Sequence, residues 1–449
     1  MHGIFRTLID QALERVDPRR LIRDQLTVEG HFLRIRGQTV DLNSIEQIHL
    51  IGAGKAAPFF REGLTDVLGD RIRGGIIVSL ADHVFEDHRI RFVPGAHPTP
   101  DARSLRAGQA VTDYIRTRVG SNDLVFFAIS GGASAMMAQP LPGLTLADKT
   151  EINRLLLASG AEVTETNCVR KHLSALKGGK LARLIHPARV ITLILSDIVD
   201  SPLDVGSSPT VINPHTRSSK AEARAILEKY HLLEQCHPRV QRFFEKTDSD
   251  PETDLPEESG AASSFSVVLG ENRVAVEAAA ECARAQGITT HILTTRDRGD
   301  VTEAARLYAA IVKEVIDSGN PFKPPVLLLS GGELTVKIEN RGTPPGKGGR
   351  NQALVLAMLM EMANISHPFA IASVGTDGID GSSDAAGAWI DHRTAEKARR
   401  QGLDPVDFFS RYDSHAFFQT LDQQVKTGPT RTNVMDLRLF YIPTGDSRG

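Results

Sequence analysis

Short apolar runs that end in a glycine or aspartate turn recur along this chain, each followed by an alanine- or leucine-rich stretch. The clearest are residues 47–51 before GAGKAAPFF, residues 124–129 before SGGASAMM, and residues 190–195 before SDIVD. This alternation is typical of βα units around a largely parallel sheet. Because ligands of open α/β sheets bind beyond the carboxyl ends of the strands, we expect the three turns to lie together.

An acidic segment rich in Pro, Ser and Gly separates this series from a second one. The segment, EKTDSDPETDLPEESGAASS at residues 245–264, contains almost no large apolar side chain and is therefore typical of a linker. Beyond it, SFSVVLG, THILTT, PPVLLLSGG and FAIASVGTDGIDG alternate with helical stretches. We predict an α/β protein of two domains, residues 1–255 and 256–449, with the active site in the cleft between them.

Charge and hydropathy limit the partners that this chain could have. Its 52 basic and 55 acidic residues give a net charge of −3 without a long block of one sign, which does not favour nucleic acid or a membrane surface. No apolar stretch is long enough to span a bilayer, and the first twenty residues predict an amphipathic helix rather than a targeting segment. The cysteines at 168, 236 and 282 form no CxxC pair, which fits a reducing compartment. We expect a cytoplasmic protein that acts on a small molecule, either as a monomer or as a homodimer.

Two copies of a Ser-Gly-Gly pattern follow strand-like runs. Paired glycines let successive backbone N–H groups point at one spot, and a helix N-terminus would add its dipole, so the pattern favours a bound phosphate or carboxylate. The alternative is a pair of tight turns that bind nothing. The candidate cofactor-binding residues in the two copies are Ser130, Gly131, Gly132, Ser134, Ser330, Gly331 and Gly332.

GAGKAA at residues 52–57 is compatible with a dinucleotide fingerprint, G-x-G-x-x-A. No acidic residue stands at a clear strand end at the expected offset, and the spacing does not fit a P-loop. The pattern leaves Lys55 at a strand-end turn, where it could offer a point charge to a phosphate. A solvated lysine at the start of a helix is the alternative.

A second cation stands in GKGGRNQ at residues 346–352, where a loop of glycines, prolines and cations runs into a long apolar helix. Gly348, Gly349 and Arg350 lie at the predicted helix start, where free backbone donors and a guanidinium would converge on one anion. The loop could also move as a lid. The alternative is an exposed linker with incidental charges.

Acidic residues follow two of the strand-like runs. GTDGIDG at residues 375–381 contains Asp377 and Asp380, and Asp197 follows the run that ends at residue 195. Carboxylates among glycines suit magnesium sites with few protein ligands, although aspartate also favours such turns by bonding its own backbone. Anion-binding turns, two cations and acidic strand ends together favour phosphoryl transfer, which depends on positioning, metal and charge neutralisation.

The chain resembles the glycerate 2-kinases of the MOFRL type, some of whose members carry the older label hydroxypyruvate reductase. Nine blocks in order carry the resemblance, and they run through most of the sequence. They are GAGKAA at 52–57, GAHPTPD at 95–101, ISGGASAM at 129–136, KGGKLA at 177–182, LSDIV at 195–199, LSGGELTV at 329–336, GKGGRNQ at 346–352, GTDGIDG at 375–381 and TGPTRTNVMD at 427–436.

This resemblance implies a Rossmann-like N-terminal domain with a parallel sheet, a smaller α/β MOFRL domain, and ATP and Mg²⁺ as cosubstrate and metal. The reaction it implies is transfer of the γ-phosphoryl group to the 2-hydroxyl of D-glycerate, giving 2-phospho-D-glycerate. Lys55 and Arg350 would neutralise the phosphates or the glycerate carboxylate. Asp197 and Asp377, with Asp380 as a further metal candidate, would hold Mg²⁺ or orient the attacking hydroxyl.

Two other functions remain as alternatives at this point. GAGKAA and the older family label suggest an NAD(P)H-dependent hydroxypyruvate reductase, and the Ser-Gly-Gly patterns alone would allow a non-catalytic sensor of a phosphorylated metabolite. The sequence also departs from the family pattern twice, with Ser208 and Arg431 where the family has glycine. Loss of a glycine constrains the backbone, and we expect a changed preference among hydroxy acids if these loops touch the substrate.

Overall fold

The computed structural model describes residues 2–211, 218–246, 264–338 and 344–445. The chain divides into two compact units. The parallel-sheet unit comprises Pro18–Ser196 and Ser201–Gly270, and the mixed-sheet unit comprises Met1–Asp17, Asp197–Asp200 and Glu271–Gly449. The predicted boundary between residues 255 and 256, and most of the predicted linker, lie outside the described residues.

Six parallel strands form the central sheet of the parallel-sheet unit, in the order β6-β5-β4-β7-β8-β9. Numbered from β4, this is the order 3-2-1-4-5-6 of dinucleotide-binding folds. The parallel sheet predicted from the sequence is therefore confirmed. The strands are β4 (Ile48–Ala53), β5 (Ile72–Ser79), β6 (Ile90–Pro94), β7 (Leu124–Ile129), β8 (Arg189–Leu195) and β9 (Phe265–Gly270).

Helices cover both faces of this sheet. The connection from β4 to β5 and the connection from β6 to β7 run in opposite directions across the sheet, so right-handed crossovers place α3 (Ala57–Leu68) and α4 (Ala102–Arg118) on opposite faces. A small antiparallel sheet precedes them. It consists of β1 (Leu26–Glu29), β2 (Phe32–Ile35) and β3 (Gln38–Asp41), after α2 (Pro18–Gln25).

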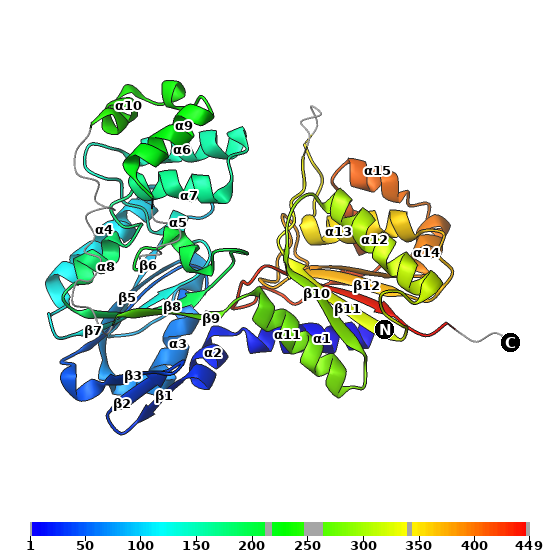
Figure 1. Cartoon of the computed structure of the whole chain (residues 1–449), viewed down its shortest axis with the longest axis horizontal. Helices are drawn as coiled ribbons and strands as arrows, with labels where there is room; N and C mark the ends of the chain where they lie inside the picture. Colours follow the sequence, from blue (N-terminus) through cyan, green and yellow to red (C-terminus); the bar gives the residue numbers. More distant parts are fainter. Residues whose placement is uncertain (1, 212–217, 247–263, 339–343, 446–449) are drawn as a thin grey trace. The chain divides into compact units, whose positions relative to one another are not determined.

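Several helices of this unit gather at one end of it, with a hydrophobic core of their own (Figure 1). Leu156, Val169, Leu227 and Phe244 are buried in that core. The helices that form it are α6 (Leu146–Ser159), α7 (Val163–His172), α9 (Lys220–Lys229) and α10 (Pro238–Glu245). The unit also contains α5 (Ala133–Met136), α8 (Lys180–Ile185) and the 3₁₀ segment η4 (Pro202–Ser207), which lies between β8 and α9 in the sequence.

The mixed-sheet unit has a second six-stranded sheet, in the order β10-β11-β15-β12-β13-β14. Only β10 and β11 are parallel; every other neighbouring pair is antiparallel. The last of these strands, β15, lies between β11 and β12 and so converts a βα series into a mixed sheet. The strands are β10 (Thr290–Asp297), β11 (Val326–Gly332), β12 (Ala370–Gly375), β13 (Gly387–Asp391), β14 (Gln424–Val425) and β15 (Asp436–Ile442).

Two helices, α1 (His2–Arg15) and α11 (Asn272–Ala285), lie together on one face of this sheet (Figure 1). The predicted amphipathic N-terminal helix is confirmed as α1, whose Phe5, Leu8 and Ile9 are buried. The other face is covered by α12 (Val301–Ser318), α13 (Arg350–Met362), α14 (Thr394–Arg400), α15 (Pro405–Ser410) and α16 (Ser414–Thr420).

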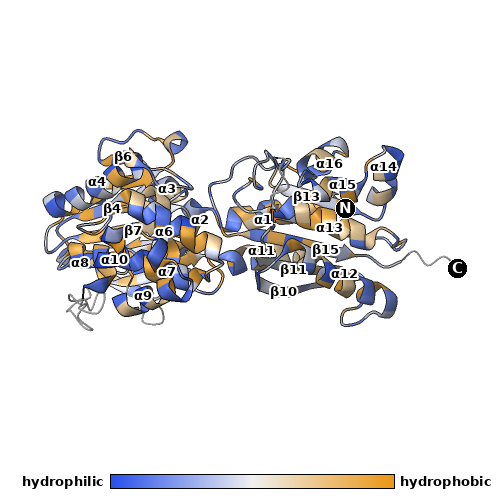
Figure 2. Cartoon of the chain, turned by 90° about the horizontal axis from the view of Figure 1, so that it is seen from above, coloured by the Kyte–Doolittle hydropathy of each residue, from blue (hydrophilic) through white to orange (hydrophobic). Residues whose placement is uncertain are grey.

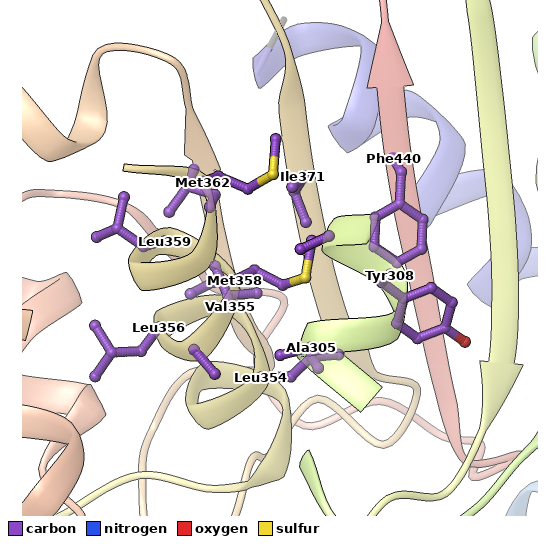
Figure 3. Close-up of a cluster of buried hydrophobic side chains, with 14 of the residues drawn as sticks. Ala305, Tyr308, Leu354, Val355, Leu356, Met358, Leu359, Met362, Ile371 and Phe440 are labelled. Atoms are coloured by element: carbon purple, nitrogen blue, oxygen red, sulfur yellow. The ribbon is translucent and has the colours of Figure 1, made fainter. Parts of the chain in front are cut away.

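The core of the mixed-sheet unit lies between α12, α13 and the strands beneath them (Figure 3). Tyr308 of α12 stacks at a tilt on Phe440 of β15, with ring centroids 4.7 Å apart. Because α13 is apolar on almost all sides, it is buried on almost all sides. Figure 2 shows this contrast, with hydrophobic colour along α13 and hydrophilic colour along α14. None of the described helices is both long enough and apolar enough to cross a membrane.

Candidate active site

The turns GAGKAA and SGGAS follow β4 and β7, the two strands at which the order of the parallel sheet reverses. Ligands of such sheets bind in the crevice at this point. The two turns are joined by hydrogen bonds: Lys55 N donates to Gly131 O at 3.0 Å, and Ala56 N donates to Ser130 Oγ at 2.9 Å. The expectation that the three strand-end turns lie together is therefore confirmed for these two, whereas Asp197–Asp200 of the third turn belong to the mixed-sheet unit.

The backbone donors of the GAGKAA turn are already occupied by acceptors of the protein. Gly54 N donates to Val78 O and Ala57 N donates to Gly54 O, in addition to the two bonds from Lys55 and Ala56. A dinucleotide fingerprint needs such donors for the pyrophosphate of the cofactor. The half-buried side chain of Lys55 is therefore the group by which this turn can act on an anion.

The SGGAS turn is arranged differently. Within the described part of the chain, the N–H groups of Gly131 and Gly132 have no protein acceptor. Gly132 has a φ of 85°, and a Cβ there would contact the ring of His97. Burial, and then the charge of Lys55, lower the pKa of His97. The charge of Lys55, the imidazole of His97 and two backbone donors thus act at one turn, although the helix that follows, α5, has only one turn.

The second Ser-Gly-Gly copy is not a turn. Ser330, Gly331 and Gly332 are the last residues of β11, and they pair in register with β15. Ser330 Oγ is buried and donates to Asp297 Oδ2 at 2.6 Å. The predicted anion-binding turn at this place is wrong, because a strand from much later in the chain takes up the backbone.

The start of α13 also differs from its prediction. Gly348, Gly349 and Arg350 lie there as expected, but the donors after them are occupied. Asp380 accepts from the backbone N–H groups of Asn351 and Gln352, both at 2.9 Å. The protein's own carboxylate fills the place where a ligand anion was predicted, and Asp380 acts as a helix cap.

Arg350 is held by a buried network of charges. Its guanidinium donates to both carboxylate oxygens of Asp436, at 2.8 and 3.0 Å, and these pairings raise its pKa. Asp436 also pairs with Arg438 at 3.1 Å, and Arg438 pairs with Asp297 at 2.9 Å. Arg438 and Asp436 are fully buried. This network fixes the direction of the Arg350 side chain.

Arg350 has a second carboxylate partner besides Asp436. Its Nη1 lies 2.7 Å from Glu333 Oε1, which the sequence analysis did not select. Burial raises the pKa of Glu333, and the charges of Asp197 and Asp377 raise it further, while Arg350 lowers it. These acids do not form a full protein cage for a cation, since no group of three or more His, Cys, Asp or Glu suited to a metal occurs among the described residues.

A pocket of about 550 Å³ adjoins Arg350 in the mixed-sheet unit. Gly348, Gly349 and Arg350 form one part of its wall, and Leu334, Phe409 and Tyr412 are among the apolar and aromatic residues of the rest. Volumes of this size are typical of small-molecule sites. The pocket suits a ligand with a flat apolar part and an anionic part.

Of the two departures from the family pattern, Ser208 is in a conformation that favours glycine. Its φ is 54°, in the left-handed region, and its hydroxyl donates to Asp204 Oδ1 at 2.8 Å. Arg431 is exposed and is not among the residues with positive φ. The predicted backbone constraint therefore applies at Ser208 and not at Arg431.

Two substitutions at position 208 separate strain from hydrogen bonding. Both Ser208→Gly and Ser208→Ala remove the hydroxyl, but only glycine relieves the left-handed strain. We expect the glycine variant to be about 0.5–1 kcal/mol more stable than the alanine variant, after the greater entropy of the unfolded glycine chain is subtracted. Urea unfolding of the two variants measures this difference, and equal midpoints would contradict it.

Comparison with known proteins gives matches over most of the chain. Residues 4–245 match a domain of unknown function, DUF4147, and residues 326–436 match the MOFRL family. A putative hydroxypyruvate reductase of Agrobacterium vitis is 38% identical over 88% of this chain and 98% of its own length. A glycerate 2-kinase of Pyrococcus horikoshii is 34% identical over 98% of this chain and 97% of its own.

A solved structure agrees with these matches. The crystal structure of a glycerate kinase from Thermotoga maritima has a TM-score of 0.82 to this chain at 30% identity, and the alignment covers 98% of this chain and 99% of that one.

Proposed function

We propose that this chain, which belongs to the MOFRL family of glycerate kinases, transfers the γ-phosphoryl group of ATP to the 2-hydroxyl of D-glycerate. The observation that carries the proposal is the position of Lys55. This residue lies at the point where the strand order reverses, on a turn whose backbone donors are already used, and its charge acts on His97. Such a turn offers charge to a phosphate but not the cradle that a dinucleotide needs.

Arg350 is the second cation of the proposed mechanism. The bidentate pair with Asp436 fixes its guanidinium, and a fixed cation needs no reorganisation as charge develops on the transferred group. ATP matches the adjoining pocket of about 550 Å³, since its base is flat and aromatic and its phosphates are anionic. We therefore assign Arg350, Gly348 and Gly349 to the binding of ATP. We assign Lys55, Gly131 and Gly132 to the anionic groups at the reacting centre, which are the transferred phosphoryl group and the carboxylate of glycerate.

Magnesium fits the acidic residues near Arg350. Mg²⁺ is commonly held by one or two carboxylates together with substrate phosphates and water, and Asp197 and Asp377 both act electrostatically on Glu333 beside Arg350. When bound, the ion would neutralise phosphate charge. Asp380 is left out of this assignment, because both of its oxygens cap α13. Either Asp197 or Asp377 could instead orient the attacking hydroxyl.

The test is phosphate transfer from ATP with Mg²⁺ to D-glycerate, with the product identified as 2- or 3-phosphoglycerate. On the same preparation, oxidation of NADH and NADPH by hydroxypyruvate measures the reductase alternative, which the name of the Agrobacterium vitis relative suggests. We expect 2-phosphoglycerate and no nicotinamide turnover. Oxidation of NADH or NADPH without phosphate transfer would overturn the proposal.

A further inference from the structure

Five cations gather near α6, α7 and α8 of the parallel-sheet unit. Lys149 comes from α6, Arg170 and Lys171 from α7, Lys177 from the loop that follows, and Lys180 from the first position of α8. We call these five residues the basic cluster. Lys149, Lys171 and Lys177 are at most 5% exposed. The proposed function assigns no role to any of them.

Lys177 connects the basic cluster to the SGGAS turn. Its Nζ donates to Ser134 Oγ and, at 2.9 Å, to Gly206 O. Both acceptors are neutral, and Lys177 forms no ion pair with any described residue. A buried ammonium therefore stands beside the turn at which the strand order reverses, with hydrogen-bond acceptors but without a counter-charge.

Arg170 and Lys180 of the basic cluster also donate hydrogen bonds to neutral oxygens. Arg170 Nε donates to Asn153 Oδ1 at 2.8 Å, and Lys180 Nζ donates to the backbone oxygens of Lys171 and Lys177, at 3.0 and 3.2 Å. Asp204 pairs with Lys171 at 3.3 Å. This carboxylate balances part of the positive charge of the basic cluster.

Lys149 is the decisive residue of the basic cluster. Its Nζ is buried and has no hydrogen-bond partner, and it forms no ion pair with any residue that the structure describes. Burial, and then the charges of Lys180 and Arg170, lower its pKa to about 7. Buried charges are normally paired. The described part of the protein provides no such partner for an ammonium at this position, so the partner would have to be a ligand.

We propose that the basic cluster binds one small oxyanion, a carboxylate or a phosphate, through Lys149, Arg170 and Lys177. The anion supplies the missing counter-charge and restores the charged form of Lys149. Lys177 contacts Ser134 of the SGGAS turn. One anionic group of the small-molecule substrate can therefore contact both the basic cluster and this turn. The proposal rests on the proposed function only for the choice of D-glycerate as a probe.

Thermal unfolding of the full chain tests this without ATP or Mg²⁺, so that the outcome does not depend on turnover. The probes are D-glycerate and inorganic phosphate, each compared with sodium chloride at the same ionic strength. We expect at least one of them to raise the Tm beyond the chloride control. A rise with D-glycerate alone identifies a carboxylate site, and a rise with phosphate alone identifies a phosphoryl site.

Lys149→Met assigns the effect to the basic cluster. The variant removes an unpaired buried charge, so its Tm without ligand should equal or exceed that of the wild type, while its affinity for the effective probe by calorimetry should fall at least tenfold. Lys229→Met is the matched control, because Lys229 is an exposed lysine of the same unit, paired with Glu165, and it should keep the wild-type affinity.

Two results would overturn the proposal: no Tm rise in the wild type with either probe beyond chloride, or undiminished affinity in Lys149→Met. If Lys149→Met does not fold, Lys149→Gln replaces it, and the wild-type arm still decides whether an oxyanion binds. Failure of the kinase assay would leave these binding measurements unaffected, so the two proposals fail separately.

Discussion

Replacing Arg438 by methionine is expected to lower the free energy of unfolding by about 3–5 kcal/mol, the range for breaking a buried ion pair by removing one partner. The guanidinium of Arg438 is fully buried in the mixed sheet, between Asp297 and Asp436. Methionine has a similar length but leaves the buried Asp436 and the partly buried Asp297 with less counter-charge. Urea unfolding followed by circular dichroism measures the change. Turnover should fall as well, because Asp436 orients Arg350.

Arg306→Met is the control for this effect. Arg306 lies on α12 of the same unit, is 59% exposed and pairs with Glu303 at 2.7 Å, so its replacement should change stability by less than about 1 kcal/mol. The double variant Arg438→Met/Asp297→Asn should recover part of the lost stability. It removes the negative charge of Asp297, which no longer has Arg438 as its partner. Equal unfolding midpoints for Arg438→Met and Arg306→Met would show that the buried network does not stabilise the fold.

Lys55→Met should lower kcat for phosphate transfer by about 10²–10³, the usual loss when one preorganised group that stabilises a developing charge is removed. The fold should persist, because the GAGKAA turn is held by backbone bonds from Gly54, Lys55 and Ala57, which the substitution leaves in place. The pKa of His97 should also rise, since the charge of Lys55 is one of the two causes that lower it. Steady-state kinetics and histidine NMR titration measure the two effects.

Lys229→Met serves again as the control, with unchanged kcat and unchanged His97 titration. A Lys55→Met enzyme with near-normal kcat would remove Lys55 from the site, even if the chain is a kinase. A normal kcat together with a raised pKa of His97 would place Lys55 beside the imidazole but away from the transferred phosphoryl group.

The part of the site formed by local sequence was predictable. An apolar run followed by glycines indicates a buried strand and its turn, and parallel strands bring such turns to one edge. Lys55 and Gly131 meet for this reason. Ser208 was also detectable, because a serine in place of a family glycine points to a constrained backbone, and its φ of 54° agrees.

The parts that depend on distant segments could not be predicted. Nothing near Arg350 indicates that Asp380 caps its helix, and nothing near Ser330 indicates that β15 pairs with it. Arg438 in DLRLFYI gives no local sign of its partner Asp297, which lies 141 positions away. Glu333 directly follows a strand, which is a usable local signal for an acidic site residue, but nothing near it in the sequence indicates that it pairs with Arg350.

The position of β15 delays completion of the mixed sheet until the end of synthesis. The ribosome makes this strand after every other strand of its sheet, yet it lies between β11 and β12. Until it emerges, each of those two strands has one unpaired edge, and open edges are templates for pairing with other chains. The nascent protein therefore carries two open strand edges from the synthesis of β12 until β15 emerges, and a chain truncated between these two strands would be prone to aggregate.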